Sequence, residues 1–171
     1  MLHMKRSKKV MFVSHSLLNQ NSMPKDKGKY PGMVTDLIEL LSESGVGLVQ
    51  LPSAEISFGA PLGRKHKTKD TLDTAPFRKH CKSMASGLMD DIEKYMKAKY
   101  QIVGILGLEH SPVEAVHQID NGNRIVPGKG ILMEEIEAEM KKRRFQVPIV
   151  GVNINNIYSS LERVQSMMNC A

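Results

Sequence analysis

The sequence is poor in the residue types that mark several large classes of proteins. Its 171 residues include no tryptophan, 5% aromatic residues and two cysteines. Cys81 and Cys170 have no metal-ligand spacing, and we expect a reduced protein of the cytoplasm. No apolar run approaches the roughly 18 residues of a membrane-spanning helix. The apolar run 10–13 behind the basic start is also too short for a signal peptide, so we expect no membrane partner.

Signatures of nucleotide binding and of common hydrolases are also missing from the sequence. It contains no glycine-rich phosphate loop, no dinucleotide fingerprint and no Gly-x-Ser-x-Gly elbow. The formal net charge of +6 would suit an anionic ligand or a polyanion. The basic clusters at 5–9, 64–69 and 141–144 are nevertheless short, are not interleaved with aromatic residues and accompany no nucleic-acid motif. We therefore expect no nucleic-acid binding.

Short apolar runs alternate with helical patterns along the whole chain. Predicted strands span 10–13, 46–51, 100–108 and 145–152. Predicted helices span 32–44, 75–97 and 131–143. A last predicted helix follows the asparagines at 153–156 and ends near 168. This alternation is typical of parallel strands joined by right-handed crossovers, with helices on both faces of the sheet. The predicted fold class is α/β, a single Rossmann-like three-layer domain over 1–171 with a basic lead at 1–8. We expect the strand order 2-1-3-4 and a switch point between strands one and three.

Three connecting segments are long for a domain of this size. Residues 22–31 hold prolines, lysines and a glycine that break regular structure, and 52–73 is the longest irregular stretch. The segment 113–130 contains Asp120-Asn121-Gly122-Asn123, a turn signal that indicates a small hairpin or an excursion over the site. Loops as long as 52–73 are usually functional or mobile, so we expect contributions to function here.

Polar side chains gather where three of the predicted strands end. Parallel strands bring their carboxyl ends to one edge of the sheet, where open α/β sheets bind ligands. Carboxylates, imidazoles and hydroxyls that meet there can perform acid/base or nucleophilic chemistry. The residues concerned are His15, Ser16, Asn19, Asn21, Ser53, Glu55, Glu109, His110, Ser111 and Glu114.

Each of these residues also has a purely structural alternative. His15 can hydrogen-bond its own turn, Glu114 can cap a helix, and serine is common at loop ends in any case. Zinc binding by His15, His110, Glu109 and Glu114 is chemically feasible, since imidazole and carboxylate are zinc ligands. No diagnostic spacing supports a zinc site, and we predict no metal.

The sequences of three of the loops resemble those of a known family. Residues 16–21 read Ser-Leu-Leu-Asn-Gln-Asn, residues 50–55 read Gln-Leu-Pro-Ser-Ala-Glu, and residues 111–116 read Ser-Pro-Val-Glu-Ala-Val. They are similar to Cys-Leu-Leu-Asn-Gln-Asn, Gln-Leu-Pro-Cys-Pro-Glu and Ser-Pro-Ser-Cys-Gly-Val in the thiouracil-desulfidase-like iron–sulfur proteins. The order of the loops and the strands before them fit as well, so the resemblance extends over about 10–143.

The resemblance departs from the family at the cluster ligands. The three cysteines that hold the family's 4Fe–4S cluster are replaced by Ser16, Ser53 and Glu114. Iron–sulfur clusters require thiolate ligands, so we expect no cluster and no other cofactor. Glu55 and Ser111 remain at positions that the resemblance associates with proton handling. We therefore assign catalytic roles to Glu55, Ser111 and Glu114, and ligand binding to the other residues of the group.

Three functions are compatible with this site. The first is a cluster-less member of the desulfidase-like family that performs acid/base chemistry on a nucleobase-like or other small polar substrate. The second is a binding or regulatory protein in which the lost cluster site is a ligand pocket. The third is a nucleoside enzyme of N-glycosidase or deoxyribosyltransferase type, in which Glu114 attacks the sugar. The expected partner is a small anionic or nucleobase-like molecule, and the sequence leaves a homodimer open.

Overall fold

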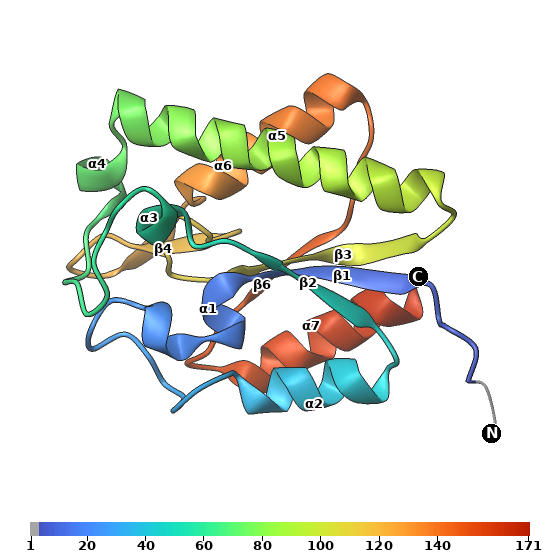
Figure 1. Cartoon of the computed structure of the whole chain (residues 1–171). Helices are drawn as coiled ribbons and strands as arrows, with labels where there is room; N and C mark the ends of the chain where they lie inside the picture. The colour runs from blue at the N-terminus through green and yellow to red at the C-terminus, as the bar shows by residue number, and fades with distance from the viewer. Residues whose placement is uncertain (1–3) are drawn as a thin grey trace.

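The fold is a three-layer α/β arrangement with a parallel sheet in the middle (Figure 1). It is taken from a computed structural model that describes residues 4–171, so residues 1–3 of the predicted basic lead lie outside the described residues. The strands of the sheet are β1 (Lys9–Ser14), β2 (Gly47–Leu51), β3 (Gln101–Leu108) and β6 (Ile149–Val152). Their spatial order is β2-β1-β3-β6, and every neighbouring pair is parallel, which confirms the predicted order 2-1-3-4.

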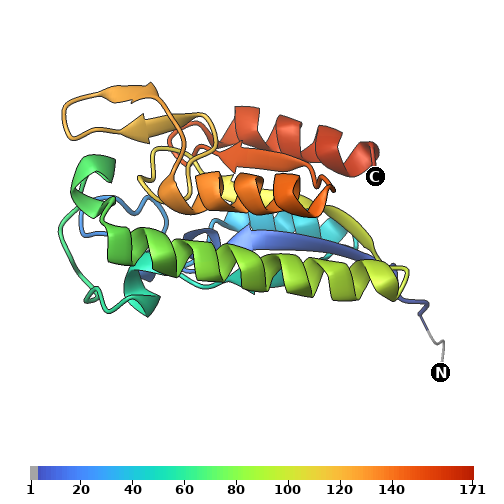
Figure 2. The same cartoon turned by 90° about the horizontal axis from the view of Figure 1, so that it is seen from above.

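Helices cover both faces of this sheet, as Figures 1 and 2 show. On one face lie α5 (Ala75–Lys97) and α6 (Ile131–Arg143), and on the other lie α2 (Thr35–Glu43) and α7 (Ile157–Asn169). Each face has its own apolar core, because both surfaces of a parallel sheet must be removed from water. Cys81 is fully buried in the core beneath α5. Among residues 4–171, no helix combines the length and the apolar character that crossing a bilayer demands.

Short elements fill the long connections. They are α1 (His15–Leu18), the 3-10 helix η1 (Gln20–Ser22), α3 (Ala54–Ser57), α4 (Lys69–Leu72), and the strands β4 (Gln118–Asp120) and β5 (Ile125–Pro127). The last two form a hairpin, one of the two alternatives predicted for this segment, and its turn is closed by backbone N–H groups that donate to the Asn121 side chain. The stretch 52–73, predicted as irregular, contains α3 and α4. Ser53 begins α3 by accepting a hydrogen bond from the Ile56 N–H at 3.4 Å.

The helix and strand boundaries follow from local chemistry. Thr74 caps α5 through the Phe77 N–H at 3.3 Å, and Pro76 lies in the first turn, where a missing N–H has no cost. The apolar pattern predicts a last strand from residue 145, but the strand begins at Ile149. Pro148, which lacks an N–H and cannot donate to a ladder, immediately precedes it, and its carbonyl accepts from the Ile105 N–H at 2.9 Å. The strands all end on the side of the molecule where α1, α3 and the hairpin gather (Figure 1).

Candidate functional site

A cavity of about 80 Å³ lies at the carboxyl edge of the sheet. Its wall is built from the segments that follow β1, β2 and β3, together with two residues after β6 and the loops 22–27 and 64–66. The volume is enough for several water molecules or one small ligand, since one water needs about 10–15 Å³ on this measure. The lining residues are Ser16, Ser22, Met23, Pro24, Lys27, Ser53, Ala54, Glu55, Arg64, His66, Leu108, Glu109, His110, Ser111, Pro112, Val113, Glu114, Asp120, Ile154 and Asn155.

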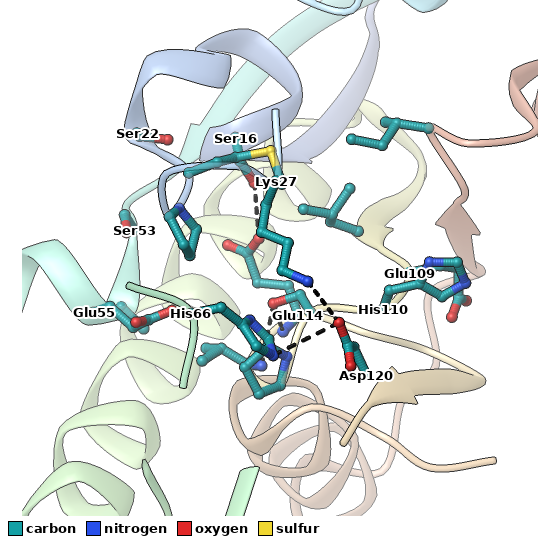
Figure 3. A pocket seen from close by; sticks show the side chains of 18 of the residues that line it. Ser16, Ser22, Lys27, Ser53, Glu55, His66, Glu109, His110, Glu114 and Asp120 are labelled. Atoms are coloured by element: carbon teal, nitrogen blue, oxygen red, sulfur yellow. Dashed lines mark hydrogen bonds and ion pairs between the residues drawn. The ribbon is translucent and has the colours of Figure 1, made fainter. Parts of the chain in front are cut away.

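The centre of the cavity is a hydrogen bond across the switch point of the sheet. Ser16 follows β1 and Glu114 follows β3, which are neighbouring strands whose chains continue to opposite sides of the sheet. The Ser16 hydroxyl donates to Glu114 Oε2 at 3.1 Å, and both residues are buried (Figure 3). The two residues are 98 positions apart in the sequence. The fold therefore brings together two of the three positions that match cluster cysteines in the sequence resemblance.

The turn after β3 holds Glu114 in place. Ser111 Oγ accepts hydrogen bonds from the N–H groups of Val113 at 3.2 Å and Glu114 at 3.0 Å. The same turn passes directly over β3 at Gly107, where a Cβ atom would collide with the Glu114 carbonyl oxygen. Glycine at this position lets the two backbones approach closely. The Glu114 side chain is thus aimed into the cavity by a backbone that has little room to move.

Burial is the main electrostatic influence on Glu114. It raises the pKa of this carboxyl from 4.5 to about 7, because an ionised carboxylate loses its hydration inside the protein. The negative charge of Glu55 raises the pKa further, whereas the Ser16 hydrogen bond and the positive charge of Arg64 oppose the shift. Both the neutral acid and the carboxylate are therefore populated near pH 7.

A buried ion pair forms one wall beside Glu114. Arg64 Nε donates to Glu55 Oε2 at 2.9 Å, with the two side chains 8% and 10% exposed. Arg64 Nη1 also donates to the Ser22 carbonyl at 2.8 Å, and the Arg64 carbonyl accepts from the Lys25 N–H at 2.8 Å. Arg64 thereby ties together three segments of the chain. Nε and Nη1 are used by these contacts, whereas Nη2 has no hydrogen-bond partner within residues 4–171.

At the rim of the cavity, the side chains of Lys27 and His66 meet on the Asp120 carboxylate. Lys27 Nζ lies 2.8 Å from Asp120 Oδ2 and His66 Nε2 lies 3.8 Å from it, and Figure 3 shows both side chains converging on the carboxylate. Burial acts to raise the pKa of Asp120, but Lys27 and the Gly122 N–H outweigh it and hold that pKa below its usual range. Asp120 therefore stays ionised and links the loop 22–31, the loop 58–68 and the hairpin.

Seven of the residues predicted from the strand ends line the cavity, and three do not. The seven are Ser16, Ser53, Glu55, Glu109, His110, Ser111 and Glu114. His15 is the first residue of α1 and does not line the cavity. Its Nδ1 is buried without a hydrogen-bond partner among residues 4–171, and burial lowers the pKa of its imidazole. Asn19 Oδ1 accepts from the N–H and the side-chain amide of Asn21, both at 3.2 Å. Asn19 and Asn21 thus shape the turn instead of facing the cavity.

Glu109 and His110 line the cavity but are tied to the hairpin. Both Glu109 carboxylate oxygens accept from the His117 N–H at 3.1 Å, and one of them also accepts from Gln118 N–H at 2.9 Å. Gly151 makes room for this carboxylate, since a Cβ there would collide with it. His110 has a φ of 73°, a strained conformation for a residue with a side chain, and its Nδ1 lies 3.3 Å from the Asn155 amide nitrogen.

The residues present do not fit an iron–sulfur cluster. The positions that would need thiolates hold Ser16, Ser53 and Glu114, and the Ser53 hydroxyl already caps α3. Cys81 is buried in the core under α5, and Cys170 is exposed near the C-terminus. Within residues 4–171, no group of three or more His, Cys, Asp or Glu side chains is arranged to hold a metal ion either. Oxygen donors of this kind are poor cluster ligands.

Sequence patterns do not single out the charged residues of the wall and the rim. Lys27, Arg64, His66 and Asp120 all line the cavity. They lie in the three long segments that loop length marks as functional, but nothing in the local sequence predicts which charge pairs with which. Lys27 and Asp120, for example, are 93 positions apart.

Comparison with known proteins finds one protein of similar sequence and one solved structure of similar fold. No family model matches the chain. The chain is 27% identical over 164 residues to an uncharacterised protein of Methanocaldococcus jannaschii, covering 93% of this chain and 98% of that protein. Among solved structures, the 4Fe-4S-dependent thiouracil desulfidase TudS matches 92% of this chain and 99% of its own, with a TM-score of 0.52 and 19% identity. The chain therefore has the fold of this thiouracil desulfidase, as its three loop sequences predict.

Proposed function

We propose that the cavity binds a small, neutral, nucleobase-like molecule and that Glu114 exchanges a proton with it, in a cluster-less relative of the desulfidases. The observation that carries this proposal is the Ser16–Glu114 hydrogen bond inside a cavity at the switch point. Open α/β sheets bind their ligands in this crevice, beyond the carboxyl ends of the strands. The solved structure with the same fold is named as a thiouracil desulfidase, which makes a pyrimidine the natural first probe.

The charges around the cavity favour a neutral ligand over an anionic one. Lys27 is paired with Asp120, and Arg64 is paired with Glu55. Each of these two cations is already balanced by a carboxylate, so an anion would gain no unbalanced positive charge here and would lie beside Glu114. A neutral ring with N–H and C=O groups can instead exchange hydrogen bonds with the Glu114 carboxylic acid. Leu108, Val113 and other apolar lining residues suit the faces of such a ring.

The surroundings of Glu114 suit a general acid or base. A group transfers protons most effectively when its pKa lies near the working pH, and burial raises the pKa of Glu114 to about 7. In this scheme the Ser16 hydroxyl is the hydrogen-bond partner of Glu114. Ser111 positions Glu114 through its backbone, and the charge of Glu55 supports the raised pKa of Glu114.

The two other functions considered for this cavity are attack on a nucleoside sugar and binding without turnover. A carboxylate that attacks a nucleoside sugar must be ionised, whereas burial favours the neutral form of Glu114. Binding without turnover needs only the cavity and its hydrogen bonds. It is therefore the main alternative, and one experiment separates it from catalysis.

The test is calorimetric titration of the protein with uracil, cytosine and 2-thiouracil, followed by incubation with each and ultraviolet absorbance to detect turnover. We expect saturable binding of at least one base, weakened about tenfold or more by Glu114→Gln, since a buried donor or acceptor that loses its partner costs about 1–3 kcal/mol. Glu39→Gln, which changes an exposed glutamate of α2, is the matched control. Binding without any absorbance change would support the non-catalytic alternative. No binding, or equal binding by Glu114→Gln, would overturn the proposal.

A further inference from the structure

The two edges of the sheet differ in how they are protected. At the β6 edge, Arg163 Nη2 from α7 donates to the Gly151 carbonyl at 3.0 Å. A charged side chain at an edge is one of the devices by which proteins prevent a free edge from pairing with another strand. Pro148, just before the strand, faces β3 instead, since its carbonyl accepts from the Ile105 N–H at 2.9 Å. The β6 edge is thus blocked by the chain itself.

The β2 edge has no such device. Its sequence Gly47-Leu48-Val49-Gln50-Leu51 contains no charge and no proline, and Gly47, Leu48 and Gln50 are exposed. Alternate residues of an edge strand direct their N–H and C=O groups away from the neighbouring strand. Within residues 4–171, no hydrogen bond joins β2 to any element other than β1. This edge can therefore accept another strand.

Helix α5 forms a groove beside this free edge. Val49 of β2 and Asp91 and Lys94 of α5 line two adjoining hollows of about 390 and 480 Å³. Asp91 and Lys94 lie one turn apart as an exposed pair, with Lys94 Nζ 3.5 Å from Asp91 Oδ1. Gly87, one turn before Asp91, is exposed and has open space around the position of a Cβ atom. At Gly87, therefore, α5 has no side chain that would keep a second helix away.

We propose that β2 is the interface at which two copies of this chain associate, by antiparallel pairing around a two-fold axis at Val49. The two four-stranded sheets would then form one continuous sheet of eight strands. In this register Leu48 of each copy lies opposite Gln50 of the other, and the two Val49 residues face each other. An interface with two-fold symmetry must be complementary to itself.

The charges beside β2 meet this requirement. Because Val49 shares its hollows with Asp91 and Lys94, an axis at Val49 also passes beside this turn of α5. The two α5 helices then run antiparallel to each other, which places Asp91 of each copy next to Lys94 of the other. The same segment thus supplies both charges of two equivalent ion pairs. Asp90, the other charged residue of these hollows, is paired with Arg143 at 2.8 Å, so Asp91 and Lys94 remain as a balanced pair. A groove of one sign would favour a foreign partner of the opposite sign, whereas this balanced pair favours a second copy.

The first test is sedimentation velocity of the full chain over a range of concentrations. We expect a dimer whose dissociation constant rises at least about tenfold in Leu48→Lys, because each copy then places a lysine against the second strand. Leu62→Lys, at an apolar residue that is 70% exposed and lies outside β2, is the matched control and should leave the dimer unchanged. A monomer at every concentration would overturn the proposal and favour an extended segment of another protein as the occupant. A dimer equally sensitive to both variants, or to neither, would also overturn it.

The second test examines the register and does not depend on the strength of association. Residues opposite each other in antiparallel strands have Cα atoms about 4.5–5.5 Å apart, within the range that a disulfide spans. Val49→Cys, in a background of Cys170→Ser, should therefore form a covalent dimer on mild oxidation. Leu48→Cys in the same background, displaced from the axis, should form much less. Equal cross-linking of the two variants, in protein with an unchanged circular dichroism spectrum, would refute the two-fold register.

Discussion

Replacing Glu114 with glutamine should stabilise the chain at neutral and alkaline pH. In the unfolded chain a glutamate releases its proton around its ordinary pKa of 4.5, whereas burial keeps Glu114 protonated in the folded chain up to about pH 7. Below pH 4.5 both states hold the proton, and the carboxyl has no effect on stability. Between pH 4.5 and about 7 only the unfolded state releases it, so the free energy of unfolding falls as pH rises. Above about pH 7 the loss is constant.

The structure sets the size of this effect. A difference between 4.5 and about 7, at about 1.4 kcal/mol for each pKa unit, corresponds to roughly 3 kcal/mol. The Glu114 residue is only 7% exposed, so solvent screening reduces this figure little. Glutamine keeps the shape of the side chain and an oxygen that accepts from Ser16, but it cannot ionise. For a chain of this length, the difference above pH 7 amounts to a Tm higher by about 6–12 °C.

The assay is urea denaturation of the wild type and Glu114→Gln at several pH values between 4 and 8.5. The difference in free energy of unfolding should change little below pH 4.5, rise through pH 5–7 and then level off. Glu39→Gln controls for the loss of a charge on the surface. A difference between wild type and Glu114→Gln that is the same at every pH would refute the reasoning, because it would show that Glu114 ionises alike in both states.

Three further predictions concern the surroundings of the site. Gly151→Ala should lower the free energy of unfolding by about 1–3 kcal/mol, because the added methyl group collides with the Glu109 carboxylate. Gly87→Ala, at an open position, should not lower it. Equal urea midpoints for these two variants would contradict the packing argument. Ser111→Ala should destabilise the chain by about 1–3 kcal/mol, since two N–H groups lose their acceptor, and should weaken base binding in the calorimeter. Anaerobic reconstitution with iron and sulfide should leave the protein colourless, and a stable brown product would contradict the absence of a cluster site.

The sheet is predictable from the sequence because its signals are local. Each strand is a short apolar run between breakers, and α5 and α6 begin and end at the residues that periodicity indicates. The apolar pattern places the start of β6 too early because it continues back through Val147, whereas Pro148 has no N–H to donate to the ladder. Helices α3 and α4 escape prediction because four residues are too few to show a period of 3.6.

The candidate site is predictable only in part, because many of its contacts join residues that are distant in the sequence. Strand ends are visible in the sequence, so the residue pattern by itself places Ser16 and Glu114 at one edge of the sheet. Because α1 begins at His15, directly after β1, the side chains of His15, Asn19 and Asn21 lie outside the cavity lining. No pattern in the sequence predicts this start of α1. The ion pairs of the rim join loops that are distant in the chain, and pairing at that distance depends on the finished fold.

The Ser16–Glu114 contact also bears on the order in which this protein folds. Each of the two residues belongs to a different half of the chain, with the whole of α5 between them. Contacts at such sequence separation form slowly, because a long loop must close before they are made. The cavity should therefore be among the last parts to assemble, after β3 has docked beside β1. A ligand that requires this cavity binds only the completed fold, and it would hold the two halves together by mass action.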